Sequence, residues 1–370
     1  MPHIVMYINK AKAFYAKYER FLSSGAFLAG FIFDNLTLRR IDLLYENVVF
    51  AWNLCLAVFA IGLINAYEAG RVKGKIADRI VPFLPIGLQF AFGGLLSAFI
   101  VFYGRSGSWL VSWPFLVFLI LLFVGNEFSR HRYLRLTFQL SMFFIALFTY
   151  AVFLLPVLFH RMGPDMFLSS GALALLITGV IVLVFWKVMP SRLEKNIKTL
   201  LLSIGCIYLA FQFSYFFNLI PPLPLSLRHS GVYHSLERTK EPGFLYKLGF
   251  EKPSWREVLQ STSNTFHWKP GTPIYVYSAV FAPKEFKLNI VHRWSHFDQE
   301  KGEWVEIHRI PFPVVGGRDG GYRGYSVKYG GIVPGKWRVD VMNERGQILG
   351  RESFTVVKAD SLPDLETVLR

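Results

Sequence analysis

The sequence predicts a membrane protein of two parts. An all-α bundle of about seven transmembrane helices precedes a small extracytoplasmic, antiparallel β-sandwich of immunoglobulin-like shape. Long apolar segments separated by short basic loops fill residues 1–220, and this pattern ends at the proline-rich run 221–224. Beyond residue 271, Val, Ile, Tyr, Phe and Trp are concentrated in short runs between Gly and Pro turns, which is typical of strands.

Composition favours a membrane protein. The hydrophobic fraction of 53%, the 36 Phe and the mean hydropathy of +0.36 are high for a soluble chain and ordinary for a polytopic one. Both cysteines, Cys55 and Cys206, lie inside apolar segments, so we expect no disulfide framework.

The net charge of +15 raises the question of a nucleic-acid partner. Residues 1–220 hold 19 Lys and Arg against 9 Asp and Glu, so most of the excess lies between apolar segments. Positive charge in such loops orients a protein in a membrane. We therefore expect the lipid bilayer, and no nucleic acid, as a partner.

Seven segments are expected to cross the membrane. The first is short, with 13 residues from Phe21 to Phe33, and its length also fits a re-entrant or interfacial segment. No small-residue cleavage site precedes Asp34, so we expect no cleaved signal there. The expected spans are 21–34, 43–66, 80–103, 109–126, 136–159, 167–189 and 197–220.

Loop charge predicts the orientation. Residues 1–20, 67–79, 127–135 and 187–198 hold 4, 4, 3 and 4 Lys or Arg, whereas 34–42, 104–108 and 160–166 hold 2, 1 and 1. The positive-inside rule places the first set in the cytoplasm. This predicts a cytoplasmic N-terminus, a full crossing by residues 21–34 and a C-terminal domain on the extracytoplasmic side.

Two groups of polar residues stand out in the membrane region. Glu46 and Asn53 are seven residues apart and share a helix face, which suits either a polar pathway or bonds between helices. Asp34, Arg39, Arg40 and Asp42 crowd one short loop at the membrane interface. This loop could bind a headgroup or partner, or could be a self-neutralising turn that caps two helices.

The C-terminal region is expected to begin with a connector, 221–270, that contains short helices at 245–249 and 255–261. The β-sandwich is expected over 271–358 and a tail over 359–370. Trp337, Val339 and Val341 alternate with polar residues, as a half-buried strand requires. The predicted strands are 273–281, 286–296, 303–311, 322–329, 335–342 and 347–357.

Short motifs in both regions carry a resemblance. They are Pro334 to Val341 (PGKWRVDV), Gly346, Ile348-Leu349-Gly350, Phe354, His292-Arg293-Trp294 and the run Phe33 to Asp42 (FDNLTLRRID). The sequence resembles uncharacterised bacterial polytopic inner-membrane proteins that end in a domain of unknown function of the 2914 type. The resemblance implies the two-part architecture and a bacterial source, and it brings no catalytic residues.

The sequence offers no catalytic, metal or cofactor site that we would assign. His292 and His296 lie about 13 Å apart along one strand, too far to share a metal, although His308 could join either of them. We expect hydrogen-bonded or surface histidines instead. No nucleophile elbow surrounds a serine in this region.

Cations and aromatic residues of the β-region provide candidate binding residues. Stacked aromatic rings with cations can hold a glycan, an anionic headgroup or an acidic protein. The alternative is that the tryptophans form the core and the cations line a solvated face. The glycine-rich loop 316–321 is expected to expose backbone N–H groups in a flexible contact loop. The candidate residues are Arg293, Arg318, Arg323, Tyr325 and Arg338.

Two functional hypotheses follow, from different classes. The first is a non-enzymatic membrane protein whose β-domain binds or stabilises another envelope component or membrane protein complex. The second is a transporter or lipid-handling protein that uses Glu46 or the loop from Asp34 to Asp42. A membrane-embedded enzyme is a third and less favoured interpretation, because the sequence shows no catalytic constellation.

Overall fold

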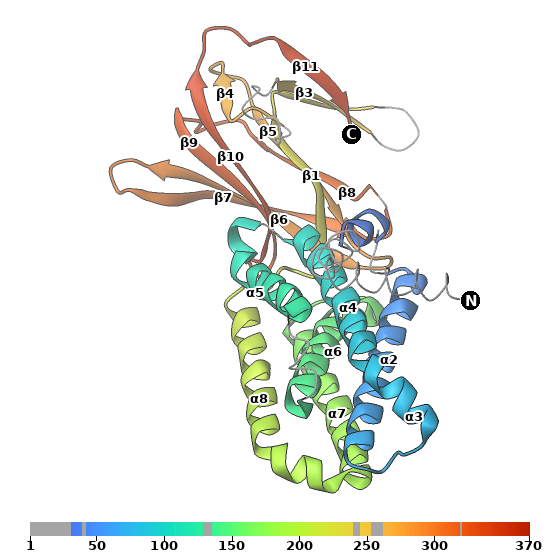
Figure 1. Ribbon diagram of the computed structural model, residues 1–370. Helices are drawn as coiled ribbons and strands as arrows, with labels where there is room; N and C mark the ends of the chain where they lie inside the picture. The colour runs from blue at the N-terminus through green and yellow to red at the C-terminus, as the bar shows by residue number, and fades with distance from the viewer. Residues whose placement is uncertain are drawn as a thin grey trace, which may run out of the picture. The chain divides into compact units, whose positions relative to one another are not determined.

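The chain folds into two compact units, which are described separately. Unit 1 comprises residues 1–102, 115–155 and 163–213, and unit 2 comprises 103–114, 156–162 and 214–370. In the computed structural model (Figure 1), the described residues are 31–38, 42–107, 109–128, 135–239, 245–252, 262–318 and 320–370.

Helices account for nearly all of the described residues of the N-terminal region, as predicted. Five helical segments are long and apolar enough to cross a membrane, and residues 112–126 form a shorter apolar helix. The expected first span falls mostly outside the described residues, although residues 31–37 are helical. The described helices are α2 (Leu44–Glu68), α3 (Lys75–Ile80), η1 (Val81–Phe83), α4 (Leu84–Ser106), α5 (Trp109–Phe128), α6 (Leu136–Phe159), α7 (Pro164–Val188) and α8 (Pro190–Phe216).

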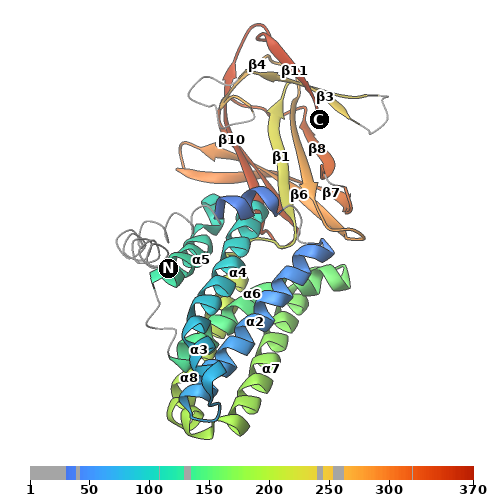
Figure 2. The ribbon, with the colours of Figure 1, turned by 45° about the vertical axis from the view of Figure 1, so that its right-hand side comes forward.

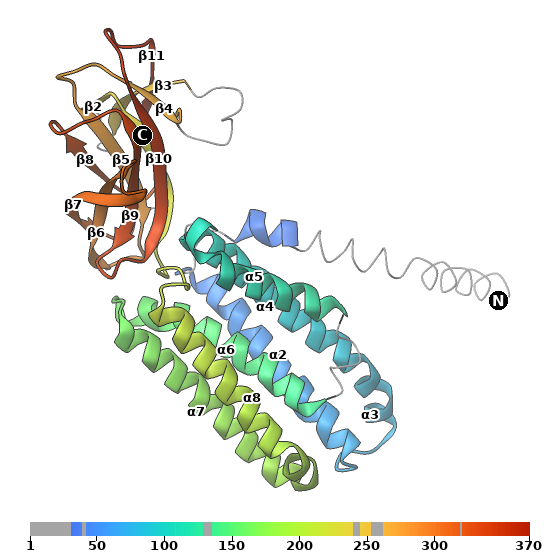
Figure 3. The ribbon, with the colours of Figure 1, turned by 90° about the vertical axis from the view of Figure 1, so that its left-hand side faces the viewer.

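The long helices run side by side (Figure 3) and carry apolar side chains on their outer faces as well as between them. Trp52 is 70% exposed, Leu183 65% and Leu202 68%. A helix in water keeps one polar face, whereas a helix surrounded by lipid is apolar on all sides. The outer faces of the helices are thus compatible with a bilayer.

Close packing of aromatic rings joins α6, α7 and α8. The Phe148 ring stacks on Phe211 with a centroid separation of 4.7 Å. Gly171 of α7 lies against this pair, and a Cβ atom there would come within 2.8 Å of Tyr208 and 3.0 Å of Phe148. A glycine is therefore required for the three helices to approach this closely.

Polar side chains link the helices in neutral pairs. Asn65 of α2 donates to Gln139 of α6 at 2.6 Å, and both side chains are fully buried. Ser170 of α7 donates to the carbonyl of Ala151 in α6 at 3.0 Å. These bonds act between helices in the manner expected of a membrane bundle.

The C-terminal region contains eleven strands among its described residues (Figure 2). All six predicted strands are present, as β5 to β10. The strands are β1 (Ser226–Tyr233), β2 (Ser235–Arg238), β3 (Tyr246–Glu251), β4 (Thr265–Trp268), β5 (Ile274–Phe281), β6 (Lys287–Asp298), β7 (Glu303–Val315), β8 (Tyr322–Lys328), β9 (Gly335–Asn343), β10 (Ile348–Lys358) and β11 (Leu365–Leu369).

These strands form three sheets, with orders β1-β5-β8, β4-β10-β9-β6-β7 and β11-β3-β2. The pairings are antiparallel except that of β4 with β10, where Thr265 is paired with Thr355 in a parallel ladder. The prediction of antiparallel sheets therefore holds for all but this edge strand.

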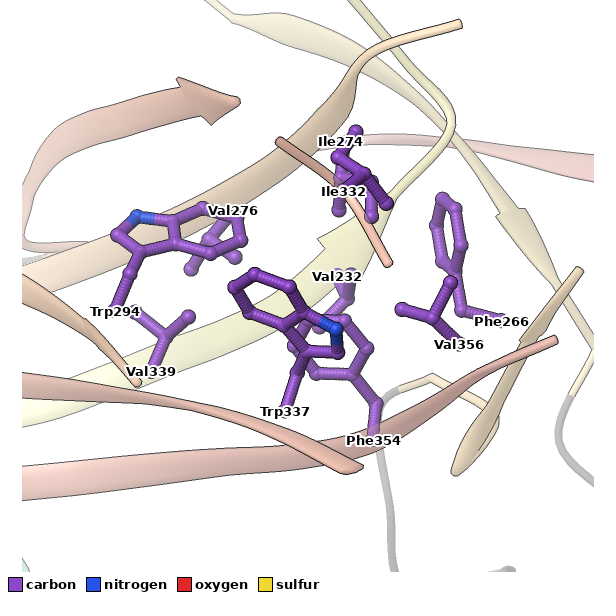
Figure 4. Close-up of a cluster of buried hydrophobic side chains, with 10 residues drawn as sticks. All are labelled: Val232, Phe266, Ile274, Val276, Trp294, Ile332, Trp337, Val339, Phe354 and Val356. Carbon is purple, nitrogen blue, oxygen red and sulfur yellow. The ribbon is translucent and has the colours of Figure 1, made fainter. Parts of the chain in front are cut away.

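The three-stranded sheet β1-β5-β8 and the five-stranded sheet enclose the main core (Figure 4). Trp294 of β6 and Trp337 of β9 are 0% and 1% exposed, and their rings meet edge to face at 6.4 Å. Val232 and Val276 reach the same cluster from β1 and β5. The expectation from alternation that both tryptophans are core residues is confirmed.

The predicted helix at residues 245–249 is wrong, because Tyr246–Glu251 is strand β3. Apolar Tyr246, Leu248 and Phe250 alternate with Lys247, Gly249 and Glu251, which is the period of a strand. Leu248 is fully buried against Tyr233 and Tyr277 of the neighbouring sheet. The predicted tail likewise contains a strand, since β11 pairs with β3. The other predicted connector helix, at 255–261, falls on residues that the structure does not describe.

Candidate functional site

The outer face of the five-stranded sheet carries a compact group of charges from three neighbouring strands. The register places Asp340 of β9 directly between Arg293 of β6 and Arg351 of β10. Because successive side chains alternate between faces, this row points away from the core that holds Trp294 and Val339. We call Arg293, Trp304, Arg338, Asp340 and Arg351 the arginine face.

Asp340 is the centre of the arginine face and is 0% exposed. Arg351 donates from Nε to its Oδ1 at 2.5 Å and from Nη2 to its Oδ2 at 3.2 Å. Arg293 donates from Nη2 to Oδ2 at 2.5 Å. Burial raises the pKa of the Asp340 carboxyl, but the hydrogen bonds from Arg351 and Arg293 outweigh it and leave the pKa below its ordinary value.

Arg338 lies one row further along β9. Its guanidinium sits over the indole of Trp304, 4.5 Å from the ring centroid, in a cation–π contact. Burial and, next, the like charge of Arg351 lower the pKa of Arg338. The Nε–H groups of Arg338 and Arg293 find no acceptor among the described residues.

This geometry leaves the arginine face short of negative charge. Three guanidinium groups share one carboxylate in this region, two of them paired with it, and the nearby Arg309 is already paired with Glu306 at 3.1 Å. Guanidinium groups form strong, often bidentate hydrogen bonds with carboxylate and phosphate oxygens. The arrangement is therefore suited to binding an anionic group.

The five candidate residues predicted from the sequence do not share one surface. Arg293 and Arg338 belong to the arginine face, whereas Arg323 and Tyr325 lie on β8, in the sheet β1-β5-β8. Ser326 of the same strand points inward, where it accepts a hydrogen bond from Trp294. Because side chains alternate along a strand, Arg323 and Tyr325 face away from the core. Tyr325 is 43% exposed and packs against Tyr246 of β3.

The loop before β8 is more tightly held than predicted. Arg318 lies over the Tyr322 ring at 5.4 Å. The backbone N–H groups of Gly316 and Gly317 donate to Phe286 and Ala282, so the expectation that they are exposed is wrong. A Cβ atom on Gly316 would come within 1.8 Å of the Pro283 carbonyl oxygen, so close packing explains this glycine.

The three histidines considered as metal ligands lie in different surroundings. His292 is 0% exposed, and its two ring nitrogens bond to Ser278 and Ser326 at 2.8 Å each. Burial lowers the pKa of His292 to about 3, so the ring is neutral. His296 packs against Trp337, and His308 is exposed. Among the described residues, no group of three His, Cys, Asp or Glu side chains is placed to hold a metal.

A pair of histidines around one carboxylate was missed by sequence reasoning. Glu251 of β3 accepts from His234 at 2.8 Å and from the ring of His267 at 2.6 Å. Burial raises the pKa of Glu251, but these hydrogen bonds outweigh it and lower the pKa overall. The cluster links β3 to β4, and no sequence spacing indicates it because Glu251 and His267 come from different strands and His234 from the bend between β1 and β2.

The candidate residues of the membrane region are only partly described. Glu46 and Asn53 are both buried on one face of α2, and Asn53 donates to Val49 of its own helix at 3.0 Å. Asp34 accepts a hydrogen bond from Ser97 of α4 at 2.5 Å. Asp42 is half-buried, and Arg39 and Arg40 lie outside the described residues, so the predicted pairing of this loop stays a prediction.

Residues 287–356 match the family described as "Protein of unknown function (DUF2914)". This segment is a DUF2914 domain. It follows the helical region, as the resemblance implied, and it runs from the start of β6 nearly to the end of β10. All five residues of the arginine face lie within the DUF2914 domain, whereas β1 to β5 precede it.

Comparisons with characterised proteins add little to the DUF2914 assignment. No curated protein matches the chain. One solved structure that the comparison matches is the Pseudomonas fluorescens alkylpurine DNA glycosylase AlkC bound to DNA containing an abasic site analog. The two sequences are 11% identical, and the match covers 86% of this chain and 99% of that chain. Its TM-score is 0.22, so this likeness carries no argument about fold or function.

Proposed function

We propose that the protein is a non-enzymatic membrane anchor whose β-region binds an acidic partner in the cell envelope. The helices hold the chain in the inner membrane with the N-terminus in the cytoplasm. The β-region then lies on the periplasmic side and presents the arginine face to another envelope protein. The apolar outer faces of the helices and the alternating loop charge support this orientation.

The observation that carries the proposal is the grouping of three guanidinium groups around one carboxylate: Arg293 and Arg351 are paired with Asp340, and Arg338 lies beside them over Trp304. Repulsion among the three cations weakens when an anion approaches, because the anion supplies the missing charge. Ion pairs with Asp340 hold two of the guanidinium groups in place beforehand, which lowers the entropic cost of binding. Acidic side chains of a partner would meet a prearranged group of donors.

We also infer that the β-region is immunoglobulin-like. When β1, β5 and β8 are taken as strands A, B and E, their order in the sheet agrees with that of immunoglobulin domains. The order β10-β9-β6 agrees equally with strands G, F and C. Domains of this shape commonly present sheet faces to protein partners, which supports a role in binding.

Site-specific photocrosslinking in native membranes tests the proposal. Ser353 of β10 is exposed and lies opposite Arg338, so a photoreactive amino acid there reports what touches the arginine face. We expect one crosslinked partner, identified by mass spectrometry, and a yield that falls at least fivefold when Arg338→Ala is added. High salt should weaken the crosslink, because the contact is electrostatic.

The matched control places the same photoreactive residue at Tyr325, which is exposed in the other sheet. Arg323→Ala should likewise leave the Ser353 crosslink unchanged. Equal crosslinking from both positions, or a Ser353 crosslink that survives Arg338→Ala, would exclude the arginine face as the binding surface.

A further inference from the structure

A large polar cavity lies within the helical unit, between the start of α6, the start of α8 and the end of α2. Its volume is about 1090 Å³, which is ample for a ligand of drug size or larger. Every residue that lines it belongs to the described part of unit 1. We call it the α6–α8 pocket.

The mouth of the α6–α8 pocket is basic. Arg135, Arg192 and Lys195 line it, with Glu68 as its one carboxylate. Arg192 forms an ion pair with Glu68. Arg135 and Lys195 have no carboxylate partner among the described residues, so the pocket keeps uncompensated positive charge.

Hydroxyl groups without partners lie beside these cations. Thr137 and Ser141 are one turn apart on α6, and both line the pocket. Their hydroxyl oxygens are buried and make no hydrogen bond to any described residue. Unsatisfied buried hydroxyls are costly, and an oxyanion that accepts from both would satisfy them.

Helix geometry adds to the attraction for an anion. The long helices α6 and α8 begin at Leu136 and Pro190, so both point their N-terminal ends toward the mouth of the pocket. Helix N-termini carry partial positive charge and free N–H groups. The cations, the hydroxyls and the helix ends therefore favour the same kind of ligand.

Apolar groups also line the pocket. Moving along α8 from Arg192, the lining passes through Ser203 to Cys206, which is exposed, and Ile207, and Phe138 lines the pocket from α6. Arg192 and Ile207 are about 22 Å apart along the helix axis at the usual rise. The outer face of α8 beside these residues is apolar, with Leu202 68% exposed and Leu209 66% exposed.

We propose that the α6–α8 pocket binds the phosphate headgroup of an anionic phospholipid. The phosphate lies between Arg135 and Lys195 and accepts hydrogen bonds from Thr137 and Ser141. The acyl chains follow the apolar wall and the outer face of α8. By the predicted orientation, the loops at this end are cytoplasmic, where anionic lipids attract basic pockets between helices.

A lipid accounts for more of the pocket than a free phosphate does. Both would satisfy the cations and hydroxyls, but only a ligand with hydrocarbon chains uses the wall formed by Phe138, Cys206 and Ile207. The proposal does not depend on the arginine face, whose residues lie in the other unit.

Native mass spectrometry of the full-length protein in an uncharged detergent tests the site. Phosphatidylglycerol and phosphatidylcholine with identical acyl chains are titrated against wild type and variants. Both lipids carry a phosphate, but the choline cation of phosphatidylcholine would be repelled by Arg135 and Lys195. We therefore expect phosphatidylglycerol to bind at least tenfold more tightly, and Arg135→Gln with Lys195→Gln to remove that preference. Lys195→Arg should retain it, because the charge remains.

Two further variants separate the site from general attraction to positive charge. Lys198→Gln removes a cation of the same helix that does not line the pocket, and it should change binding less than twofold. Ser141→Val changes no charge and should weaken the binding of phosphatidylglycerol several-fold, because one hydrogen bond to the phosphate is lost.

The opposite results would overturn the proposal. These are equal binding of the two lipids to wild type, or an unchanged preference in the Arg135 and Lys195 variants. Displacement of phosphatidylglycerol by millimolar inorganic phosphate would assign the pocket to a soluble phosphate compound and would overturn the lipid as its ligand.

Discussion

The two units of this protein bury polar groups in different ways. In the helical unit the fully buried pair of Asn65 and Gln139 is neutral, and the buried carboxylate of Glu46 lies in the first turn of its helix. In the β-unit a full carboxylate, Asp340, is buried and held by two arginines. The outer surfaces of the two units also differ. The helices expose leucine and tryptophan side chains, whereas the sheet exposes the guanidinium groups of arginines.

The solvent around each unit explains the difference. An arginine that pairs with Asp340 keeps contact with water at the sheet surface, where Arg293 and Arg351 are 25% and 21% exposed. A charge between helices in a bilayer has no water on either side, so neutral amides are the less costly choice. Free cations in the helical unit accordingly occur near helix ends, as at the α6–α8 pocket.

The largest expected effect is on the main core of the β-unit. Trp294→Ala removes a fully buried side chain and should reduce the free energy of unfolding of the β-unit by about 4 kcal/mol. Hydrogen exchange of β6 and β9 amides in the full-length protein measures this loss. Trp304→Ala, on the outer face, is the control and should cost about 1 kcal/mol; equal losses would contradict the assignment of core and surface.

The buried charge should be more costly to disrupt than a neutral pair. Asp340→Asn leaves Arg293 and Arg351 without a carboxylate, and it should destabilise the β-unit by about 3 kcal/mol. Hydrogen exchange of the β6 and β9 amides measures this loss as well. Asp298→Asn, in the hairpin between β6 and β7, is the control. A loss below that of the control would mean that the arginines are stable without Asp340.

Acid should destabilise the β-unit while leaving the neutral pairs of the helices unaffected. His292 has a folded pKa of about 3 against about 6.5 when unfolded, so protons bind the unfolded state preferentially. Stability is therefore complete above pH 6.5 and falls as the pH drops, by about 2 kcal/mol at pH 5. His229, whose pKa burial and the charge of Arg370 lower to about 4, contributes in the same range. His292→Gln should therefore reduce the pH dependence of unfolding between pH 7 and 5 by about half, and an unchanged dependence would contradict the role of His292.

The smallest effect is expected between the helices. Gln139→Leu removes the acceptor of Asn65 and should reduce bundle stability by about 1 kcal/mol. Unfolding of the detergent-solubilised protein by increasing dodecyl sulfate measures it, with Leu201→Ala on the exposed face as the control. A loss as large as that of Asp340→Asn would remove the distinction between the two units.

Local pattern explains what could be predicted. The alternation around Trp337 predicted that its side chain is buried. The Gly and Pro turns predicted the positions of all six strands from β5 to β10. Strand β3 shows the same alternation in Tyr246 to Glu251 but is short, and its position after a proline run favoured a connector instead. Arg293 and Arg338 were identified as candidates, but grouping them with Arg323 required a register that the sequence does not contain.

By itself, the sequence determined the division into apolar helices and a β-region, because hydrophobic length and periodicity are local properties of the chain. It also determined which face of β9 is buried. Only the tertiary structure decided that Arg293, Asp340 and Arg351 form one row, and that Arg135, Thr137 and Lys195 share one pocket. Such groupings depend on strand register and helix packing between distant segments, which many non-local contacts fix together.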